Sequence, residues 1–98
     1  MIVVGKDKLA AFCRKHADAR PRFSRWLQVV ESTLWRNFAE VRATFLNADL
    51  VRKGDVAFVV FNVGGNNYRV STIIQYQAGV VYIDRPMTHD EYSRWSQG

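Results

Sequence analysis

The stretch 61-FNVGGNNYRV-70 joins two strand-like runs through a glycine–asparagine turn. Glycine and asparagine tolerate positive φ angles, so Gly64 to Asn67 predict a tight β hairpin. The run before the turn, residues 56–63, is almost continuously apolar, which is typical of a strand covered on both faces. The run after it, residues 68–76, alternates, so Arg69 faces away from Tyr68. An arginine inside a hairpin needs either a partner or a ligand.

Upstream of this hairpin, the sequence predicts a strand and two helices. Residues 1–4 are short and β-branched, which indicates a strand. Apolar residues recur at helical spacing over residues 6–17 and again from Pro21, a residue that suits the first helical position, to about residues 35–37. Residues 38–54 are mixed and predict either a short helix or an irregular crossing, which leads into a polar turn at residues 52–55.

Downstream, residues 80–85 predict a third strand of the meander, ended by Pro86. Thr88, followed three residues later by Glu91, is a capping-box pattern that predicts a short terminal helix. The order β-α-α-β-β-β-α predicts an α+β fold, with a curved, mainly antiparallel sheet and a helical hairpin on one face. The chain has 98 residues, so we expect one domain over residues 1–98.

The composition is that of a basic globular protein. Lys and Arg number 14 against 9 Asp and Glu, and the net charge of +5 comes from residues 1–54, where eleven cations face five anions. This asymmetry indicates an anionic partner such as nucleic acid, although solvated helix faces explain it equally well. No apolar run approaches the ~18 residues of a membrane helix, and the N-terminus does not resemble a signal peptide. We therefore expect a cytoplasmic protein without membrane contact.

The sequence shows no metal or phosphate-loop motif. Two isolated histidines, without matching cysteines or carboxylates, do not predict a metal site, and no cofactor is expected. Gly64-Gly65 joins strand to strand and lacks the lysine of a nucleotide-binding loop, so we interpret it as a turn. Cys13 is the single cysteine and is expected to be a buried core thiol.

Three residues of the C-terminal part form a candidate site. His89 and Tyr92 lie three positions apart in the predicted terminal helix, and Arg69 lies on the strand beside the last one. A cation, a proton acceptor and a phenol suit RNA cleavage by the RNA's own 2′-hydroxyl, because a base must remove the 2′ proton and a cation must stabilise charge on phosphorus. Spacing alone favours a simpler interpretation, in which Arg69 pairs with Asp84 and Tyr92 packs on the sheet.

The same residues resemble the HigB-type toxins of bacterial toxin–antitoxin pairs. In that family, Phe-Asn-x-x-Gly-Asn-x-x-Arg is followed by Tyr-Ile and by Thr-His-x-Glu-Tyr. The matching positions here are Phe61, Asn62, Gly65, Asn66, Arg69, Tyr82, Ile83, Thr88, His89, Glu91 and Tyr92, preceded by a tryptophan at Trp35. Ser93 stands where the family pattern usually has aspartate.

The resemblance implies a RelE-like fold and an mRNA endonuclease that acts without metal, typically on the ribosome, and inhibits translation. It also implies a helix-turn-helix antitoxin of the HigA type, through which alone the toxin would reach operator DNA. Arg69 would bind the scissile phosphate and stabilise its charge, His89 would act as general acid or base, and Tyr92 would position or stack on the nucleotide.

Five further cations are candidates for RNA contact. Arg52 and Lys53 lie at the mouth of the predicted sheet, and Arg22, Arg25 and Arg36 would add salt-dependent affinity for RNA or the ribosome. Two other functions remain open. One is a non-catalytic module that blocks translation or regulates by binding RNA, the ribosome or DNA alone, and the other is a structural small protein whose arginines are only surface.

Overall fold

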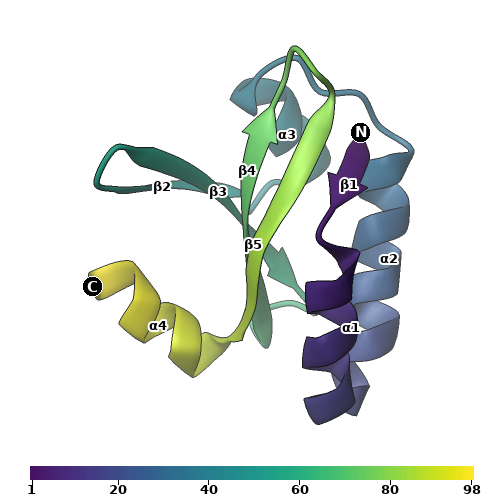
Figure 1. The fold of residues 1–98 in the computed structure, drawn as a ribbon, viewed down its shortest axis with the longest axis vertical. Helices are drawn as coiled ribbons and strands as arrows, with labels where there is room; N and C mark the ends of the chain where they lie inside the picture. The colour runs from purple at the N-terminus through teal and green to yellow at the C-terminus, as the bar shows by residue number, and fades with distance from the viewer.

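A five-stranded sheet runs through the centre of the protein, and the computed structural model describes residues 1–98 (Figure 1). The strands are β1 (Ile2–Val4), β2 (Asp49–Lys53), β3 (Val56–Val63), β4 (Tyr68–Gln75) and β5 (Val80–Thr88). Their order across the sheet is β1-β5-β4-β3-β2. Neighbouring strands are antiparallel except β1 and β5, which are parallel. The predicted α+β class is confirmed, and the sheet is open and mixed.

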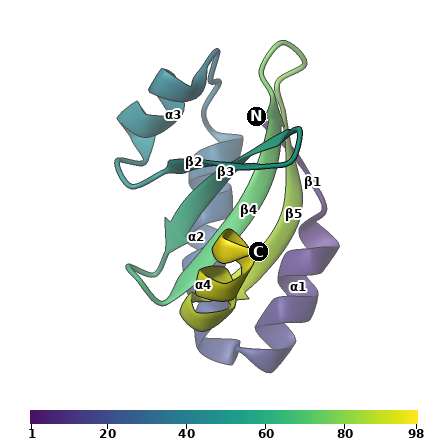
Figure 2. The same ribbon diagram turned by 90° about the vertical axis from the view of Figure 1, so that its left-hand side faces the viewer.

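Helices lie on both sides of this sheet. α1 (Lys6–Lys15) and α2 (Arg20–Glu31) are joined by a 3-10 turn at Ala17–Ala19 and form the predicted helical hairpin on one face. α4 (His89–Gln97) lies on the opposite face, in front of the sheet when α2 is behind it (Figure 2). None of the helices has the length and apolar character needed to cross a membrane.

Phe61 lies at the centre of the core between the sheet and the helical hairpin. Its side chain is fully buried, and its ring lies 5.3 Å from the ring of Trp26 on α2 and 5.2 Å from that of Phe45. Trp35 stacks on it, with ring centroids 6.0 Å apart. Tyr68, at the start of β4, belongs to the same core cluster. The β3–β4 hairpin therefore turns Phe61 and Tyr68 toward the helical hairpin, where edge and stacked contacts add to the gain from burial.

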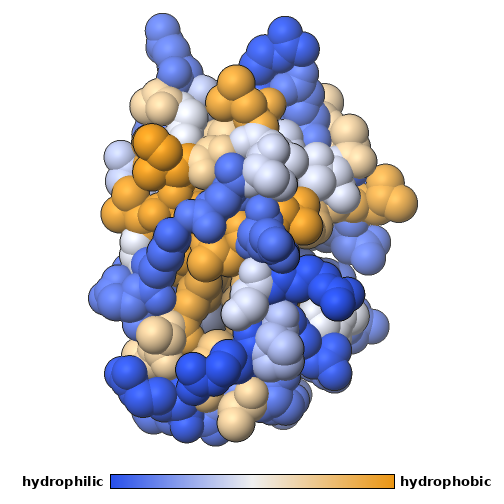
Figure 3. Space-filling view, turned by 90° about the vertical axis from the view of Figure 1, so that its right-hand side faces the viewer, coloured by the Kyte–Doolittle hydropathy of each residue, from blue (hydrophilic) through white to orange (hydrophobic).

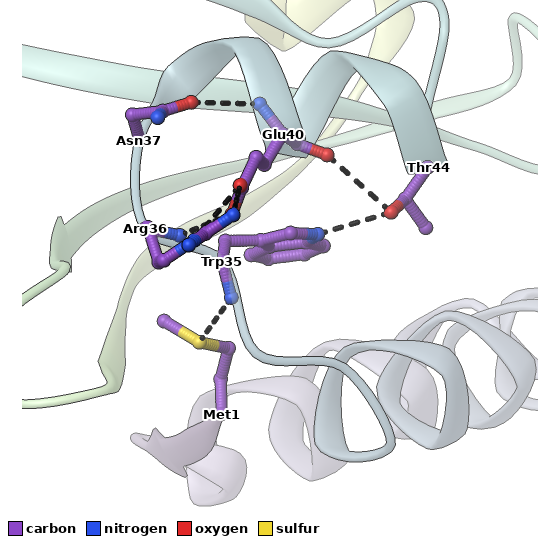
Figure 4. Close-up of polar contacts among 6 residues, drawn as sticks. All are labelled: Met1, Trp35, Arg36, Asn37, Glu40 and Thr44. Atoms are coloured by element: carbon purple, nitrogen blue, oxygen red, sulfur yellow. Dashed lines mark hydrogen bonds and ion pairs between the residues drawn. The ribbon is translucent and has the colours of Figure 1, made fainter.

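Trp35 fixes the chain between α2 and the next helix (Figure 4). Its indole N–H donates to Thr44 Oγ1 at 3.0 Å, and its backbone N–H donates to the buried sulfur of Met1 at 3.2 Å. The indole is thus both packed and hydrogen-bonded, as is usual for a buried tryptophan.

Residues 38–44 form a short helix, α3 (Phe38–Thr44), which is the first of the two structures predicted for this segment. Asn37 caps it, because its Oδ1 accepts from the Glu40 N–H at 3.0 Å. The Glu40 carboxylate also binds the guanidinium of Arg36 at 2.8 Å (Figure 4). These local bonds fix the start of a helix that the apolar residues alone left as one of two alternatives.

Residues 49–53 form a strand, whereas the sequence predicted a short helix or an irregular crossing over residues 38–54 and a polar turn over residues 52–55. Arg52 and Lys53 belong to β2, which pairs with β3 along its whole length, and only Gly54 and Asp55 make the turn. β2 is the edge of the sheet. Edge strands commonly carry charged side chains, so this strand lacked the apolar pattern that would have revealed it.

The end of α2 also differs from the prediction. The helix ends at Glu31 rather than near residues 35–37. The hydroxyls of Ser32 and Thr33 donate to backbone carbonyls one turn earlier, each at 2.9 Å, and such side-chain bonds compete with continued helix. Leu34, which the helical spacing assigned to the apolar stripe, is 73% exposed.

β5 continues through Pro86 to Thr88, although proline was expected to end it. Pro86 pairs with Val70, close to a shift of register between Ser71 and Thr72. Proline lacks an N–H donor and is tolerated at such irregularities. The extra residues bring the strand directly to the cap of α4.

Phe61→Ala should lower the free energy of unfolding by about 3–5 kcal/mol, because it leaves a cavity among three aromatic rings. Urea denaturation followed by circular dichroism measures this change. Leu34→Ala is the control, since the exposed side chain should change stability by less than about 0.5 kcal/mol. Equal effects of the two substitutions would contradict the assignment of Phe61 to the core.

Candidate functional site

Arg69 lies on the face of β4 that turns away from the helical hairpin. It pairs with Asn62 on β3 and with Met87 on β5. The residue is only 9% exposed. Its Nη1 donates to the backbone oxygens of Asn66 and Tyr68 at 3.2 Å each, and its Nη2 donates to Asn66 Oδ1 at 3.4 Å. Neutral oxygens therefore orient this buried cation without cancelling its charge.

The alternative in which Arg69 pairs with Asp84 is wrong. Asp84 Oδ2 accepts from Ser71 Oγ at 2.8 Å, and the ion pairs of this protein involve other residues. The register of β4 and β5 shifts between Ser71 and Thr72, and Asp84 is the β5 residue left without a strand partner. Such a bulge moves the following residues to the opposite faces, so Met87 rather than Pro86 stands across from Arg69.

Tyr92 on α4 lies against the guanidinium of Arg69. The Arg69 Cζ is 5.3 Å from the centroid of the Tyr92 ring, which is a cation–π contact. Burial and the negative charge of Asp49 raise the pKa of the Tyr92 phenol, and the charge of Arg69 acts in the opposite sense. The phenol is therefore protonated at neutral pH. The predicted approach of Arg69 and Tyr92 is confirmed.

α4 is fixed at both ends. At its start, the Thr88 N–H donates to Glu91 Oε1 at 2.8 Å and Thr88 Oγ1 accepts from the Glu91 N–H at 3.2 Å, so the predicted capping box forms. At its end, the ring of Trp95 lies 5.2 Å from that of Phe58. The Lys53 ammonium is 4.5 Å from the Trp95 ring and donates to the Trp95 carbonyl, so this cation supports the C-terminal turn of the helix.

An open hollow of about 390 Å³ lies beside Arg69 and Tyr92. Six parts of the chain supply its lining, which consists of Arg42, Leu46, Asn47, Ala48, Asp49, Val60, Asn62, Arg69 and Tyr92. Arg42 adds a second guanidinium, held by a bond from its Nη2 to the Leu46 carbonyl at 3.1 Å. Asp49 adds a carboxylate. Two cations, a carboxylate and a neutral phenol are groups that bind phosphate and move protons.

Arg42 and Asp49 were missed by reasoning from the sequence. Both come from residues 38–54, whose structure the pattern left open. They reach the hollow only because α3 forms and β2 pairs with β3, and neither event has a strong local signal. The excess of arginine in the N-terminal half was the one available indication for Arg42.

His89 lies at the first position of α4 and is exposed. Its backbone N–H donates to the Asn67 carbonyl at 3.2 Å, which ties the helix to the β3–β4 turn. No hydrogen bond joins its imidazole to Arg69 or Tyr92, and it does not line the hollow. The structure therefore brings together two of the three predicted catalytic residues, and the exposed third, His89, lies outside the hollow that they share.

The remaining predicted RNA contacts are scattered. Arg52 is exposed on β2. Arg36 donates to Glu40 from both Nε and Nη2, so its charge is already paired. Arg22 and Arg25, on α2, lie on the other side of the β3–β4 turn.

No group of three or more His, Cys, Asp or Glu side chains is arranged to hold a metal ion. Cys13 is buried as predicted, and burial raises the pKa of its thiol. It borders a small groove between α1 and α2, seen as an apolar band among hydrophilic side chains on the helical side of the molecule (Figure 3).

The sheet, with a helical hairpin on one face and a cationic hollow under the last helix, is consistent with a toxin of the RelE-like class. The family model HigB_toxin, described as the RelE-like toxic component of a toxin–antitoxin system, matches residues 19–95. The chain belongs to this family and is the toxin component of a toxin–antitoxin system, which implies an antitoxin partner. Membership suggests ribonuclease activity in general. No match was found among curated protein sequences.

Glu91→Gln should destabilise the protein at pH 7 and have less effect in acid. The hydrogen bonds with Thr88 lower the pKa of the Glu91 carboxyl below its ordinary value of 4.5. The stabilisation is therefore complete above that value and is lost as the pH falls through the folded-state pKa. Urea denaturation at pH 7 and pH 3 measures the difference. Asp90→Asn is the matched control, and an equal loss for both at each pH would contradict the role of the capping box.

The pKa of Tyr92 should respond in opposite directions to its two charged neighbours. Asp49→Asn removes a negative charge that opposes the phenolate, so it should lower the pKa, whereas Arg69→Gln should raise it further. Carbon-13 NMR of the labelled tyrosine rings follows each titration. Tyr76, whose pKa is raised by burial alone, is the internal control and should not change. Equal shifts of both rings would indicate a global rearrangement instead.

Proposed function

We propose that this toxin is an mRNA endonuclease that cuts during translation, with the RNA 2′-hydroxyl as nucleophile. Its substrate would be mRNA on the ribosome in the cytoplasm. A helix-turn-helix antitoxin of the HigA type would inhibit this activity, and the toxin would bind operator DNA only through that antitoxin.

The observation that carries this proposal is the unpaired charge of Arg69. Burying a cation without an anionic partner costs stability, because the charge loses hydration and gains only neutral acceptors. Arg69 is buried, its acceptors are amide oxygens, and it borders a hollow open to solvent. A phosphate entering the hollow would supply the missing negative charge, and a planar guanidinium binds phosphate through two parallel hydrogen bonds.

Cleavage requires two proton transfers around one phosphorus atom. A base removes the 2′ proton, the 2′ oxygen bonds to phosphorus, and the bond to the 5′ oxygen breaks as that oxygen gains a proton. The products are a 2′,3′-cyclic phosphate and a free 5′-hydroxyl. Arg69 would bind the nonbridging oxygens and stabilise the charge that develops on them.

The remaining groups of this face supply the proton carriers. His89, which is exposed to an approaching substrate, would act as general acid or base, and Tyr92 would orient the nucleotide from its half-buried position. Asp49 is a second candidate for the base, because its carboxylate lines the hollow. Arg42, which lines the same hollow as Arg69, would add a second guanidinium for the phosphate.

The test is primer extension on mRNA from cells that express the protein. New 5′ ends should appear with the parent and should fall by about 10²- to 10³-fold with Arg69→Ala, as for loss of one charge-stabilising donor. Arg69→Lys keeps the positive charge but lacks the planar guanidinium that makes two parallel hydrogen bonds, so its activity should be little higher than that of Arg69→Ala. His89→Ala should reduce cutting by about 10²-fold or more. Arg14→Ala, on α1, is the control and should cut like the parent.

Two results would contradict the proposal. If folded Arg69→Ala and His89→Ala both cut as well as the parent, the site assignment is wrong. Growth arrest without new 5′ ends would instead support a toxin that blocks translation by binding alone.

A further inference from the structure

A second hollow, of about 440 Å³, lies on the other side of the β3–β4 turn. It is lined by Pro21, Arg22, Arg25, Gly64 and Gly65. The proline ring is the one apolar side chain among them. The turn lies at the end of the molecule where both α2 and α4 begin (Figure 1). This hollow is separate from the one that contains Arg69, because the two share no lining residue.

The arginines of this hollow have no partner within the protein. Arg22 and Arg25 are exposed, three positions apart on α2, and neither forms an ion pair. Like charges at this spacing repel, and cations in the first turns of a helix oppose its dipole. The first turn of α2 has no acidic residue, and Asp18, the carboxylate before it, bonds to the Tyr68 hydroxyl at 2.8 Å and forms no ion pair with either arginine, so two cations stand against one anion here. An uncancelled positive potential therefore remains at this point.

Gly64 allows Arg22 to lie directly on the turn. A Cβ atom at Gly64 would stand 2.5 Å from Arg22 Cδ and 3.1 Å from its Nη1, so any side chain would displace the guanidinium. Gly64 and Gly65 both have positive φ angles of 66° and 67°. The glycine pair thus makes the hairpin turn, and because glycine has no side chain, its backbone is exposed to the hollow that the two arginines also line.

The same turn supports the Arg69 site. Asn66, the residue after Gly65, holds Arg69 through its backbone and side-chain oxygens. The exposed turn therefore lies between the two cationic hollows. A polynucleotide that crosses this turn would place one phosphate on each side of it.

We propose that the hollow of Arg22, Arg25, Gly64 and Gly65 binds a second phosphodiester of the RNA strand whose scissile phosphate lies at Arg69. The inference rests on the proposed ribonuclease function for its substrate class. It assigns these two arginines to one discrete subsite that positions the strand and takes no part in bond cleavage.

The experiment measures binding of a fluorescent single-stranded RNA whose riboses are all 2′-O-methylated, so that it cannot be cut. Fluorescence anisotropy between 50 and 200 mM salt gives the slope of log affinity against log salt concentration. Each phosphate contact contributes about 0.7 to this slope for single strands. The double variant Arg22→Gln/Arg25→Gln should bind more weakly, and the magnitude of its slope should be smaller than that of the parent by about 0.7, the value for one phosphate contact. The matched control, Arg14→Gln/Lys15→Gln on α1, should keep the parent slope.

Arg69→Ala provides an independent arm. In this variant, addition of the RNA should still shift the amide NMR signals of Gly64 and Gly65, and inorganic phosphate should shift them only at much higher concentration. Equal shifts with phosphate and RNA at equal concentration would indicate a free-phosphate site and would overturn a strand subsite.

Other outcomes also count against the subsite. No binding of RNA by the parent, or the same loss of slope in both double variants, would overturn it. So would a double variant that binds RNA like the parent but binds the antitoxin more weakly, because the hollow would then serve the protein partner. Translation-coupled cutting that depends on Arg69 would survive each of these failures, so the proposed function is tested separately.

Discussion

The pairing of Asn62 with Arg69 across the β3–β4 hairpin is the constraint on which both faces of the sheet depend. Because side chains alternate along a strand, this register sends Phe61 and Tyr68 into the helical layer and sends Asn62 and Arg69 to the opposite face. A slip of one residue would bury the guanidinium among aromatic rings and expose the centre of the core. The turn at Gly64-Gly65 sets that register, so core packing and site geometry have one common origin.

The two faces have opposite energetic roles. On the helical side, Phe61, Trp26 and Trp35 pack as a continuous aromatic cluster, and burial there stabilises the fold. On the other side, Arg69 is buried with neutral acceptors, and Tyr92 closes over it from a short capped helix. The second face costs stability that the first offsets. That division is typical of a binding site placed on a fold with an independent core.

The positive charge of the chain has several uses, and only some cations are free to meet an anion. Arg36 is paired with Glu40, and Lys53 holds the last turn of α4 through Trp95. Arg69 and Arg42 border one hollow, whereas Arg22 and Arg25 border another. The net charge therefore indicated that the partner is an anion. Which cations are already bound to groups of the protein decides where that anion could bind.

Local patterns in the sequence determined the hairpin, the helical pair, the capped terminal helix and the presence of Arg69 and Tyr92 near one another. The first three depend on residues a few positions apart: a glycine turn, apolar spacing, or Thr88 with Glu91. The proximity of Arg69 and Tyr92 followed instead from the predicted pairing of the last two strands. Only the tertiary structure decided that residues 49–53 are a strand, that Asp84 bonds to Ser71 rather than to Arg69, and that Arg42 and Asp49 complete the hollow. These features arise from pairing between distant segments, where backbone hydrogen bonds and packing outweigh the weak preferences of a short charged stretch.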